Sequence, residues 1–425
     1  MERHCSSPSV GLGATLSHLG YPVDVSEPRP ALRPLLPLLC ALSACQSSDT
    51  DTASSTPAAD TAPSTDLPAV IGCNPDLDPF QVTYLMQTSI PTVPRLHWES
   101  SKPTTVRIIT DVGRDELLES PLSETKATHG EVLVLGIPFQ RDSWSVVVAE
   151  TDHGLACSKP LHWNAPMLMA ALPELTLTVR DPDPAEGGYT TAGMLTEKSS
   201  LLVILDEYGE YIWTQTTGEG FISRVYFDRE KSGLEYMSWA QSWDGPASIR
   251  RVTMSGEVWE STEVTGGHTD YVHLPDGGYA AISYDLREVV DDAGEVHSIL
   301  GDRIVEVDAE GQEREIWSTF DLYTPDLSQD YWIVEIGDAK NLKDWTHGNG
   351  LTYDPASDDY IMSLYGLGSL VRIDRETGEM LWQLSDSHGG FVSTTGEPLV
   401  QAAHSVELLS ENHLLVFNRN ISNPL

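Results

Sequence analysis

The 425-residue sequence predicts an all-β fold, with an N-terminal β-sandwich followed by a β-propeller. Two observations predict it. Short apolar-rich runs separated by Pro, Gly and Asp fill residues 69–163, a rhythm typical of small antiparallel sandwiches. From residue 164 to residue 425, two kinds of strand–turn–strand element alternate along the chain, as the halves of propeller blades do.

A leader precedes the folded part. Arg29 and Arg33 stand before a short apolar run, which ends in small residues and is too short to span a bilayer. The residues L-S-A-C at 42–45 resemble the lipobox of bacterial lipoproteins, which implies that residues 1–45 hold a lipoprotein signal peptide and that Cys45 is lipidated. An ordinary buried apolar run is the alternative, and the true start codon stays open.

The segment that follows the leader predicts a tether. Residues 46–68 lack aromatic side chains and consist almost entirely of Ser, Thr, Ala, Asp and Pro, so they cannot bury enough apolar area to order themselves. Gln46, directly after the lipidated position, favours the outer membrane. The sequence therefore predicts an exported lipoprotein at the periplasmic face of the outer membrane or at the cell surface, held there only by its lipid.

The predicted sandwich has three clear strands, at residues 106–109, 131–135 and 144–148. The stretch from 128 to 149 resembles a strand, turn and strand of a fibronectin-type domain. After removal of the leader, two cysteines remain in an oxidising compartment, and an even pair there indicates a disulfide. A disulfide would tie the two ends of this domain together, and two free buried thiols are the alternative. The two cysteines are Cys73 and Cys157.

Four segments of the predicted propeller share an apolar strand, a turn with Gly and then a Trp. Their glycines, at 209, 256, 311 and 378, are 47, 55 and 67 residues apart, and spacings near 50 are typical of blades. The glycine is expected to supply the turn and the Trp to pack between neighbouring blades. The segments span residues 201–213, 249–259, 303–317 and 370–382.

A second element alternates with the first and is expected to supply the inner half of each blade. It recurs at residues 223–239, 268–285, 347–365 and 404–420. About four whole blades and one incomplete blade follow from this count. An outer half is missing after the last inner element, so either the chain is truncated or an early strand, such as Leu175–Val179, closes the ring.

In three successive blades the inner element begins with a histidine: His268, His347 and His404. Equivalent positions in radially repeated blades lie at one height around the axis, so the three imidazoles are expected to converge at one mouth of the channel. Each histidine could instead cap a strand. Converging imidazoles could bind zinc or copper, but among their neighbours only Asp270 offers a further ligand, and no metal is predicted. They could also supply a nucleophile with acid and base partners.

The formal net charge of −39 narrows the classes of partner. A surface of this sign repels phosphate backbones and anionic lipid, so binding of nucleic acid and polybasic docking on a membrane are both excluded from the expected functions. No sequence feature indicates a cofactor. The charge bears on solubility and partners and carries no information about the fold.

Several segments resemble bacterial arylsulfate sulfotransferases. These are D-W-T-H-G-N-G-L-T-Y-D at 344–354, I-D-R-E-T-G-E-M-L-W at 373–382, Q-A-A-H-S-V-E-L-L at 401–409, V-F-N at 416–418 and, more loosely, G-H-T-D-Y-V-H-L-P-D-G at 267–277. The resemblance implies a six-bladed periplasmic propeller behind a β-sandwich. It also implies transfer of a sulfuryl group from a phenolic sulfate ester to a phenol through a sulfohistidine, with no nucleotide donor.

The resemblance also implies roles for particular residues. His404 matches the nucleophile of the family, and His347 with Asn349 matches residues that hold the sulfuryl oxygens. His268 matches a further histidine that assists the leaving or accepting oxygen. Neutral imidazole can attack sulfur while fixed donors stabilise charge on the equatorial oxygens, so the implied chemistry is coherent.

Two positions depart from the family pattern. Where the family carries a Ser-Arg pair, this chain has Leu364-Tyr365, and the paired histidine of the family is His268-Thr269 here. By analogy with deleted oxyanion donors, loss of the guanidinium costs about 2–4 kcal/mol in the transition state. Tyr365 is expected to contact the substrate; its hydroxyl can donate one hydrogen bond, but it carries no charge. The alternative is a non-catalytic, surface-tethered propeller that binds a ligand or protein partner; the donor, the acceptor and the oligomeric state stay open.

Overall fold

The computed structural model describes residues 66–77, 81–114, 116–164, 172–173, 175, 188–196, 199–218, 220–228, 233–386, 389–410 and 413–418. The leader, the lipidation site Cys45 and all but the last three residues of the predicted tether lie outside this range. So does the candidate ring-closing strand, apart from Leu175. In the described parts of the chain, no helix has the length and apolar character that crossing a membrane requires.

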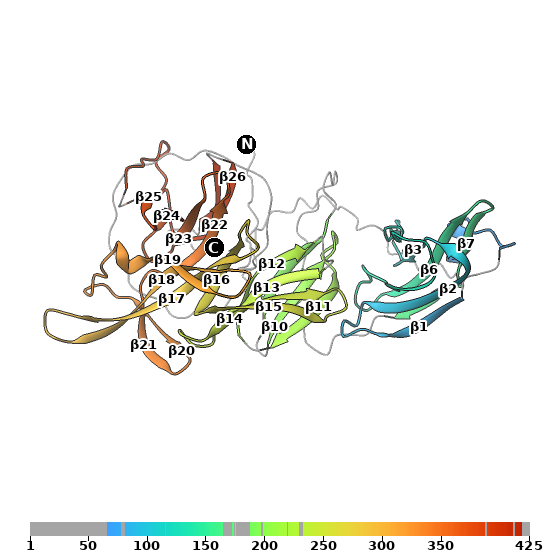
Figure 1. Ribbon diagram of the computed structural model, residues 1–425, viewed down its shortest axis with the longest axis horizontal. Helices are drawn as coiled ribbons and strands as arrows, with labels where there is room; N and C mark the ends of the chain where they lie inside the picture. The colour runs from blue at the N-terminus through green and yellow to red at the C-terminus, as the bar shows by residue number, and fades with distance from the viewer. Residues whose placement is uncertain are drawn as a thin grey trace, which may run out of the picture.

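The described secondary structure is almost entirely β, which confirms the predicted class. Two sheets form the N-terminal sandwich, and its strands are coloured blue to teal at one end of the molecule in Figure 1. The three strands predicted here correspond to β3, β5 and β6. The strands are β1 (Gln81–Gln87), β2 (Pro94–Thr104) and β5 (Ala127–Leu133) in one sheet, and β4 (Leu118–Glu119), β3 (Arg107–Asp111), β6 (Asp142–Thr151), β7 (Gly154–Cys157) and β8 (Leu161–Asn164) in the other.

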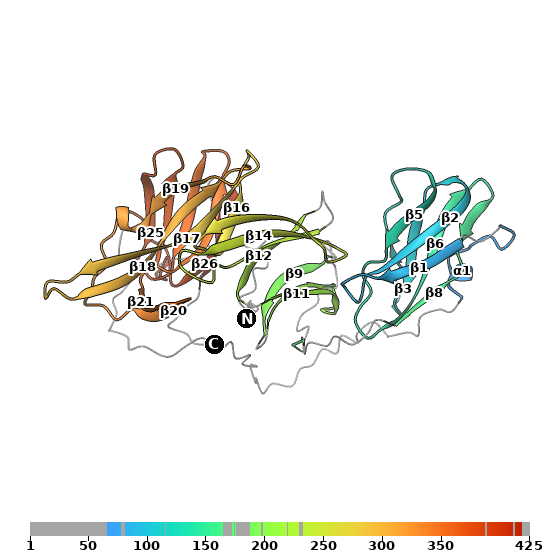
Figure 2. The same ribbon diagram turned by 60° about the horizontal axis from the view of Figure 1, so that its bottom comes forward.

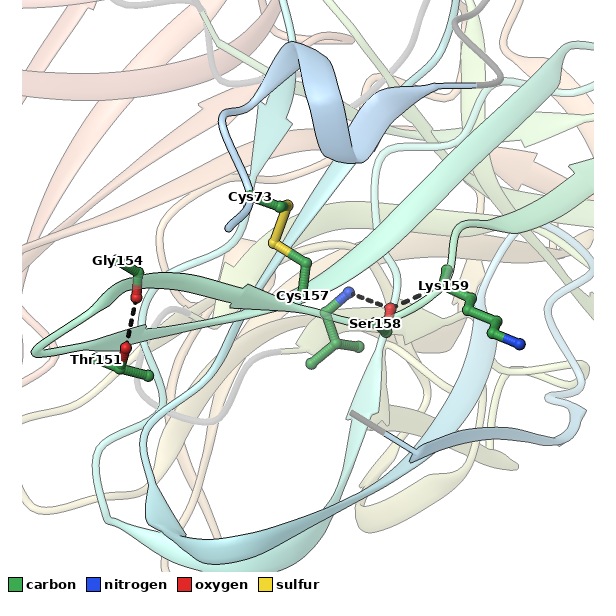
Figure 3. Close-up of a disulfide and its surroundings, with 7 residues drawn as sticks. Cys73, Thr151, Gly154, Cys157, Ser158 and Lys159 are labelled. Carbon is green, nitrogen blue, oxygen red and sulfur yellow. Dashed lines mark hydrogen bonds between the residues drawn. A yellow bond between two sulfur atoms is a disulfide. The ribbon is translucent and has the colours of Figure 1, made fainter. Parts of the chain in front are cut away.

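A short helix, α1 (Leu67–Val70), covers the second sheet of the sandwich. Leu67 is fully buried against β3 and β6, so the last residues of the predicted tether belong to the folded part. Cys73 follows the helix and is bonded to Cys157 of β7, as Figure 3 shows. The disulfide joins residues 84 apart in sequence and fixes the start of the domain on its last hairpin.

The sandwich is anchored to the first of the later sheets. Ile90 and Val93, in the β1–β2 connection, are buried in the same core cluster as Trp213. The Thr92 hydroxyl donates a hydrogen bond of 2.6 Å to the Ile212 carbonyl, which satisfies a buried polar group at this joint. The two parts therefore share a core at their contact, although they occupy opposite ends of the long axis in Figure 2.

The rest of the described chain forms five sheets in sequence order, each built on consecutive antiparallel strands, as propeller blades are. Three contain four blade strands, one has three and the last has two. The blades are β9 (Thr190–Leu195), β10 (Ser200–Leu205) and β11 (Tyr211–Gly218); β12 (Ile222–Asp228), β13 (Gly233–Ser238), β14 (Pro246–Thr253) and β15 (Val258–Thr265); β16 (Gly267–His273), β17 (Tyr279–Val290), β18 (Val296–Val307) and β19 (Glu313–Ser318); β22 (Gly348–Asp354), β23 (Asp359–Leu364), β24 (Ser369–Asp374) and β25 (Met380–Ser385); and β26 (Ala403–Ser410) with β27 (His413–Asn418).

The third blade carries an addition. After β19, the short 3-10 helix η1 (Thr319–Asp321) leads to a hairpin of β20 (Trp332–Ile336) and β21 (Ala339–Asp344). Strand β21 pairs in parallel with β18, through Ile299 with Lys343 and Leu300 with Asp344. The hairpin therefore extends this sheet sideways and ends directly before the segment that holds His347.

The repeated Gly and Trp behave largely as predicted. The four repeat glycines all have positive φ, between 70° and 87°, in the turns of the outer hairpins. Trp213 and Trp317 are buried, and the indole of Trp213 donates to the Met254 carbonyl of the next blade. Trp382 is partly buried against the last blade. The prediction is wrong for Trp259, which is 40% exposed and lies over the Arg251 side chain instead.

The innermost strands β12, β16, β22 and β26 contact one another in that order. Each contains a register shift close to its start. Of the eight non-glycine residues with positive φ in the described chain, five lie at these starts. Such bulges re-aim side chains and persist only where the surroundings hold them, so the strained backbone is concentrated at one end of the inner strands. The five are Arg224, Thr269, His347, Ala402 and Ser405.

Candidate active site

His347 lies in the turn that enters β22, and a carboxylate holds its ring. Its Nδ1 is 2.6 Å from Asp344 Oδ2, at the end of the inserted hairpin. Burial alone would lower the pKa of His347, but the hydrogen bond and charge of Asp344, with the charge of Asp302, outweigh burial and raise the pKa above its ordinary value. The ring is therefore fixed by one nitrogen and favours the protonated form.

His404 lies near the start of β26 and faces Asn349 of the neighbouring β22. The Asn349 amide Nδ2 and His404 Nε2 are 3.4 Å apart, the outer limit of a hydrogen bond from the amide to the ring. The two strands approach closely because of Gly350. A Cβ there would lie 2.8 Å from the backbone nitrogens of Ser405 and Val406, so any larger residue would push β26 away.

Tyr365 connects these two histidines. Its ring centroid lies 5.5 Å from that of His347 and 5.8 Å from that of His404, in edge-on contacts. Trp332 of the inserted hairpin packs against both Tyr365, at 5.0 Å, and His347, at 5.3 Å. The two imidazoles and two aromatic side chains thus form one continuous cluster, with the Asn349 amide beside it.

His268 is placed differently from the other two histidines. It is only 4% exposed and stacks on Tyr284, with ring centroids 3.9 Å apart. Its Nδ1 contacts the Thr269 hydroxyl at 2.8 Å, and its Nε2 lies 3.0 Å from Asp302 Oδ1 as an ion-pair contact rather than a well-aligned hydrogen bond. Both ring nitrogens thus face protein groups, and His268 contacts the cluster only indirectly.

The link is Asp302 of β18, a buried carboxylate between two blades. It accepts hydrogen bonds from the Thr346 hydroxyl and from the Gly348 amide, the residues on either side of His347. Burial would raise the pKa of Asp302, but His268, Thr346 and Gly348 outweigh burial and hold the pKa below its ordinary value. Asp302 therefore fixes the turn that presents His347.

Among the residues predicted from sequence, the structure brings together His347, His404, Asn349 and Tyr365. Asp270, considered as a further metal ligand, does not join them. Its carboxylate accepts from the backbone amides of Leu351 and Tyr271 and faces Arg224.

Three residues of this region were not predicted: Asp344, Asp302 and Trp332. Asp344 had a visible signal, since it stands three residues before His347 in the D-W-T-H segment. Asp302 and Trp332 lie 45 and 15 residues before His347 and reach it only through the pairing of β18 with the inserted hairpin. No local sequence pattern marks them.

A separate surface lies toward the far ends of the inner strands, and the Arg224 side chain reaches it from the bulge near the start of β12. Arg224 Nη2 pairs with Glu407 Oε1 at 2.5 Å, and its Nε donates to the Tyr226 hydroxyl at 2.6 Å. Asp270 is buried beside it. Burial raises the pKa of Asp270 to about 6, although Arg224 acts in the opposite direction. These residues adjoin an open cavity of about 440 Å³ whose other walls include His273 and Tyr353.

Only one group of side chains in the described chain has ligand atoms close enough to hold a metal ion. Asp291, Glu295 and His297 lie at the tip of the β17–β18 hairpin, with ligand atoms within 4.8 Å of one another. The Asp291 carboxylate already accepts from two backbone amides of its turn. This group is not part of the histidine cluster.

Known proteins offer three comparisons with this chain: curated sequences, solved structures and family models. The search of curated proteins finds no match. Among solved structures, a protein of unknown function from Bacteroides caccae is 13% identical, covers 69% of this chain and 97% of its own, and has a TM-score of 0.30. Hydrazine synthase from Kuenenia stuttgartiensis is 14% identical, with coverage of 66% and 74% and a TM-score of 0.30. An apocarotenoid oxygenase from Synechocystis is 11% identical, with coverage of 81% and 88% and a TM-score of 0.28.

The family comparison is more informative, because it covers the segments that carry the histidine cluster. A model described as arylsulfotransferase (ASST) matches residues 174–422, more than half of the chain, and includes His268, His347 and His404. This chain therefore belongs to the arylsulfotransferase family, which supports an arylsulfate sulfotransferase-like activity on a small aryl sulfate donor and a phenol acceptor.

Proposed function

We propose that this protein transfers a sulfuryl group from an aryl sulfate to a phenol, with His404 Nε2 as the nucleophile. The observation that carries the proposal is the contact between His404 Nε2 and the Asn349 amide, beside a ring cluster that includes His347. A nitrogen that accepts this hydrogen bond carries no proton and keeps its lone pair for attack on sulfur. The neighbouring amide can then donate to a sulfuryl oxygen.

The reaction has two halves that balance in protons and charge. In the first, the lone pair of His404 Nε2 forms a bond to sulfur while the bond between sulfur and the aryl oxygen breaks. The leaving phenoxide takes the Nε2 proton of His347 and departs as a phenol. In the second, an acceptor phenol returns a proton to His347 as its oxygen bonds to sulfur and the N–S bond breaks.

His347 is suited to both proton transfers because Asp344 holds its other nitrogen. The 2.6 Å contact to Asp344 fixes the ring and favours its charged form, so a proton is available on Nε2 for the leaving oxygen. A cationic His347 also supplies positive charge near the sulfuryl group. It thereby offsets part of the charge lost where Tyr365 replaces the arginine of the family.

His268 serves in this proposal as a positioning residue. Its contacts to Asp302 and Tyr284 leave it buried, and Asp302 in turn fixes the turn around His347. This assignment differs from direct assistance to the leaving or accepting oxygen.

The test uses the whole protein, a chromogenic aryl sulfate and a phenol acceptor. Phenol release that depends on acceptor, together with a peptide containing His404 that gains one SO₃ group after brief exposure to donor alone, is the expected result. His404→Gln keeps a polar side chain of similar reach and should abolish both signals. Full release in His404→Gln would contradict the nucleophile assignment. Absence of release with every acceptor would favour the alternative, a binding protein without catalysis, for which the substitution at Tyr365 is the supporting observation.

We also propose that the protein is an exported lipoprotein anchored through Cys45. The support is the short apolar run before L-S-A-C at 42–45 and the disulfide between Cys73 and Cys157, which requires an oxidising compartment. Metabolic labelling with a fatty acid should modify the full chain and not its Cys45→Ala variant; equal labelling of both would overturn the anchor.

A further inference from the structure

We propose that Trp332 and Tyr365 form an aromatic wall that binds the aryl group of the substrate, and that this wall selects flat, uncharged aryl groups larger than one ring. The inference rests on the proposed function for the chemistry at His404. The wall itself can be measured by binding alone, without turnover.

The inserted hairpin delivers Trp332 to the histidine cluster. Trp332 on β20 is the direct register partner of Asp344 on β21, and Asp344 holds His347. The same pair of hairpin residues therefore places a carboxylate on one nitrogen of His347 and an indole against its ring. A hairpin that only extended the sheet would not need an aromatic residue at this position.

The ring contacts lead from the nucleophile to the surface. Tyr365 contacts His404, and Trp332 contacts Tyr365 with the two ring planes inclined by 37°. Trp332 meets His347 at an interplanar angle of 87°, so the two rings are not stacked. A flat group that begins at the sulfuryl position beside His404 can continue along Tyr365 to Trp332.

The wall is open. Trp332 is 46% exposed, whereas Trp345, directly after the same hairpin, is 3% exposed. An aromatic side chain left uncovered beside a polar cluster is typical of ligand surfaces. Aromatic contacts of this kind contribute a factor of about 3 to 10 in affinity beyond simple area burial.

The negative charges near the aromatic wall affect which substituents the aryl group can carry. Asp344 and Asp302 lie behind His347, and the net charge of the chain is −39, so acidic substituents on the ring are disfavoured. Because one nucleophile serves donor and acceptor in turn, both aryl groups occupy the same wall. A bicyclic phenol reaches both Tyr365 and Trp332, whereas a single ring beside His404 reaches mainly Tyr365.

The experiment measures binding of 2-naphthol and of phenol by calorimetry to the whole protein and to three variants. Trp332→Ala should weaken 2-naphthol binding about 3- to 10-fold and phenol binding less than 2-fold, and Trp332→Phe should restore most of the difference. Trp259→Ala is the matched control, because Trp259 is also exposed, at 40%, but lies over Arg251 in another blade. It should leave both affinities unchanged.

Equal binding of 2-naphthol to Trp332→Ala and to the unchanged protein would overturn the wall. A loss with Trp259→Ala as large as that with Trp332→Ala would also overturn it, since the effect would then be general. If the expected pattern appears but no sulfuryl transfer is found, the wall stands and the catalytic proposal fails. In an active protein, Trp332→Ala should raise KM for bicyclic donors and acceptors in parallel.

Discussion

The two ends of the inner strands use polar residues in opposite ways. At the start of β22 and β26, His347 and His404 are half-buried, the backbone is strained at several non-glycine positions, and aromatic rings lie partly open. At the far ends, Arg224 is paired with Glu407 and bonded to Tyr226. The first end keeps groups available for a ligand, whereas the second satisfies its charges within the protein.

The pairing of charges distinguishes the cavity at the far ends from the reactive site at the histidine end. The far ends adjoin an open cavity, yet the charged residues in its wall neutralise one another. At the histidine end, buried carboxylates act on ring nitrogens and leave the second nitrogen of His347 for chemistry. Strained backbone at His347, Ala402 and Ser405 adjoins these ring nitrogens, so the histidine end is the one to test.

The largest expected effect on turnover comes from substituting one histidine at each end and comparing the two variants. His404→Ala should reduce kcat for aryl sulfate turnover by about 10⁴-fold or more, because loss of a nucleophile removes the covalent route. His273→Ala, at the far cavity and 48% exposed, should leave kcat within about 3-fold. Steady-state release of a chromogenic phenol measures both. Comparable losses in the two variants would remove the functional distinction between the ends.

The next effect concerns the donor beside the nucleophile. Asn349→Ala should lower kcat by about 10²- to 10³-fold with little change in KM, since its amide acts on charge that develops in the transition state. Asn349→Asp keeps the size of the side chain and removes the donor, so it should be at least as damaging. A change confined to KM would instead indicate that Asn349 only binds the ground state.

The pH profile tests the pairing of His347 with Asp344. Since Asp344 raises the pKa of His347, the active protonated form persists to higher pH, and activity should fall as pH rises through that raised pKa. Asp344→Asn removes the charge, so the alkaline limb of kcat/KM should move to lower pH, with a loss of about 10- to 100-fold near neutrality. An unmoved alkaline limb would exclude His347 as the group that titrates.

Much of the fold could be predicted from local sequence. The turn glycines and tryptophans repeat because each blade needs a residue with left-handed backbone in its turn and a large apolar side chain that packs against the next blade. Trp259 breaks the pattern because its side chain finds Arg251 on its own sheet. Strand periodicity and the repeat thus give the blades, whose main contacts are local in sequence.

The site could be predicted only in part. His347 and His404 begin equivalent strands, and the repeat alone brings them near one another, whereas Asn349 followed from the family resemblance of its segment. The role of His268 could not be predicted, because the partner that buries it, Asp302, belongs to an outer strand of its own blade. Trp332 was missed for a similar reason: its place depends on parallel pairing of an inserted hairpin with β18. Pairing between segments that are distant in sequence leaves no local pattern.

The smallest expected effect on turnover comes from the far ends, and it completes the comparison. Glu407→Gln removes the closest negative charge from Arg224 while keeping the side-chain volume, and leaves Asp270 as the carboxylate that faces the guanidinium. The free energy of unfolding should fall by about 1–3 kcal/mol, as measured by denaturant titration, because a partly buried guanidinium loses its closest ion-pair partner. At a temperature where both proteins are folded, kcat should change less than about 3-fold. A large loss of kcat with unchanged stability would mean that Arg224 and Glu407 act on the substrate, and the two ends would then have to be regarded as one continuous site.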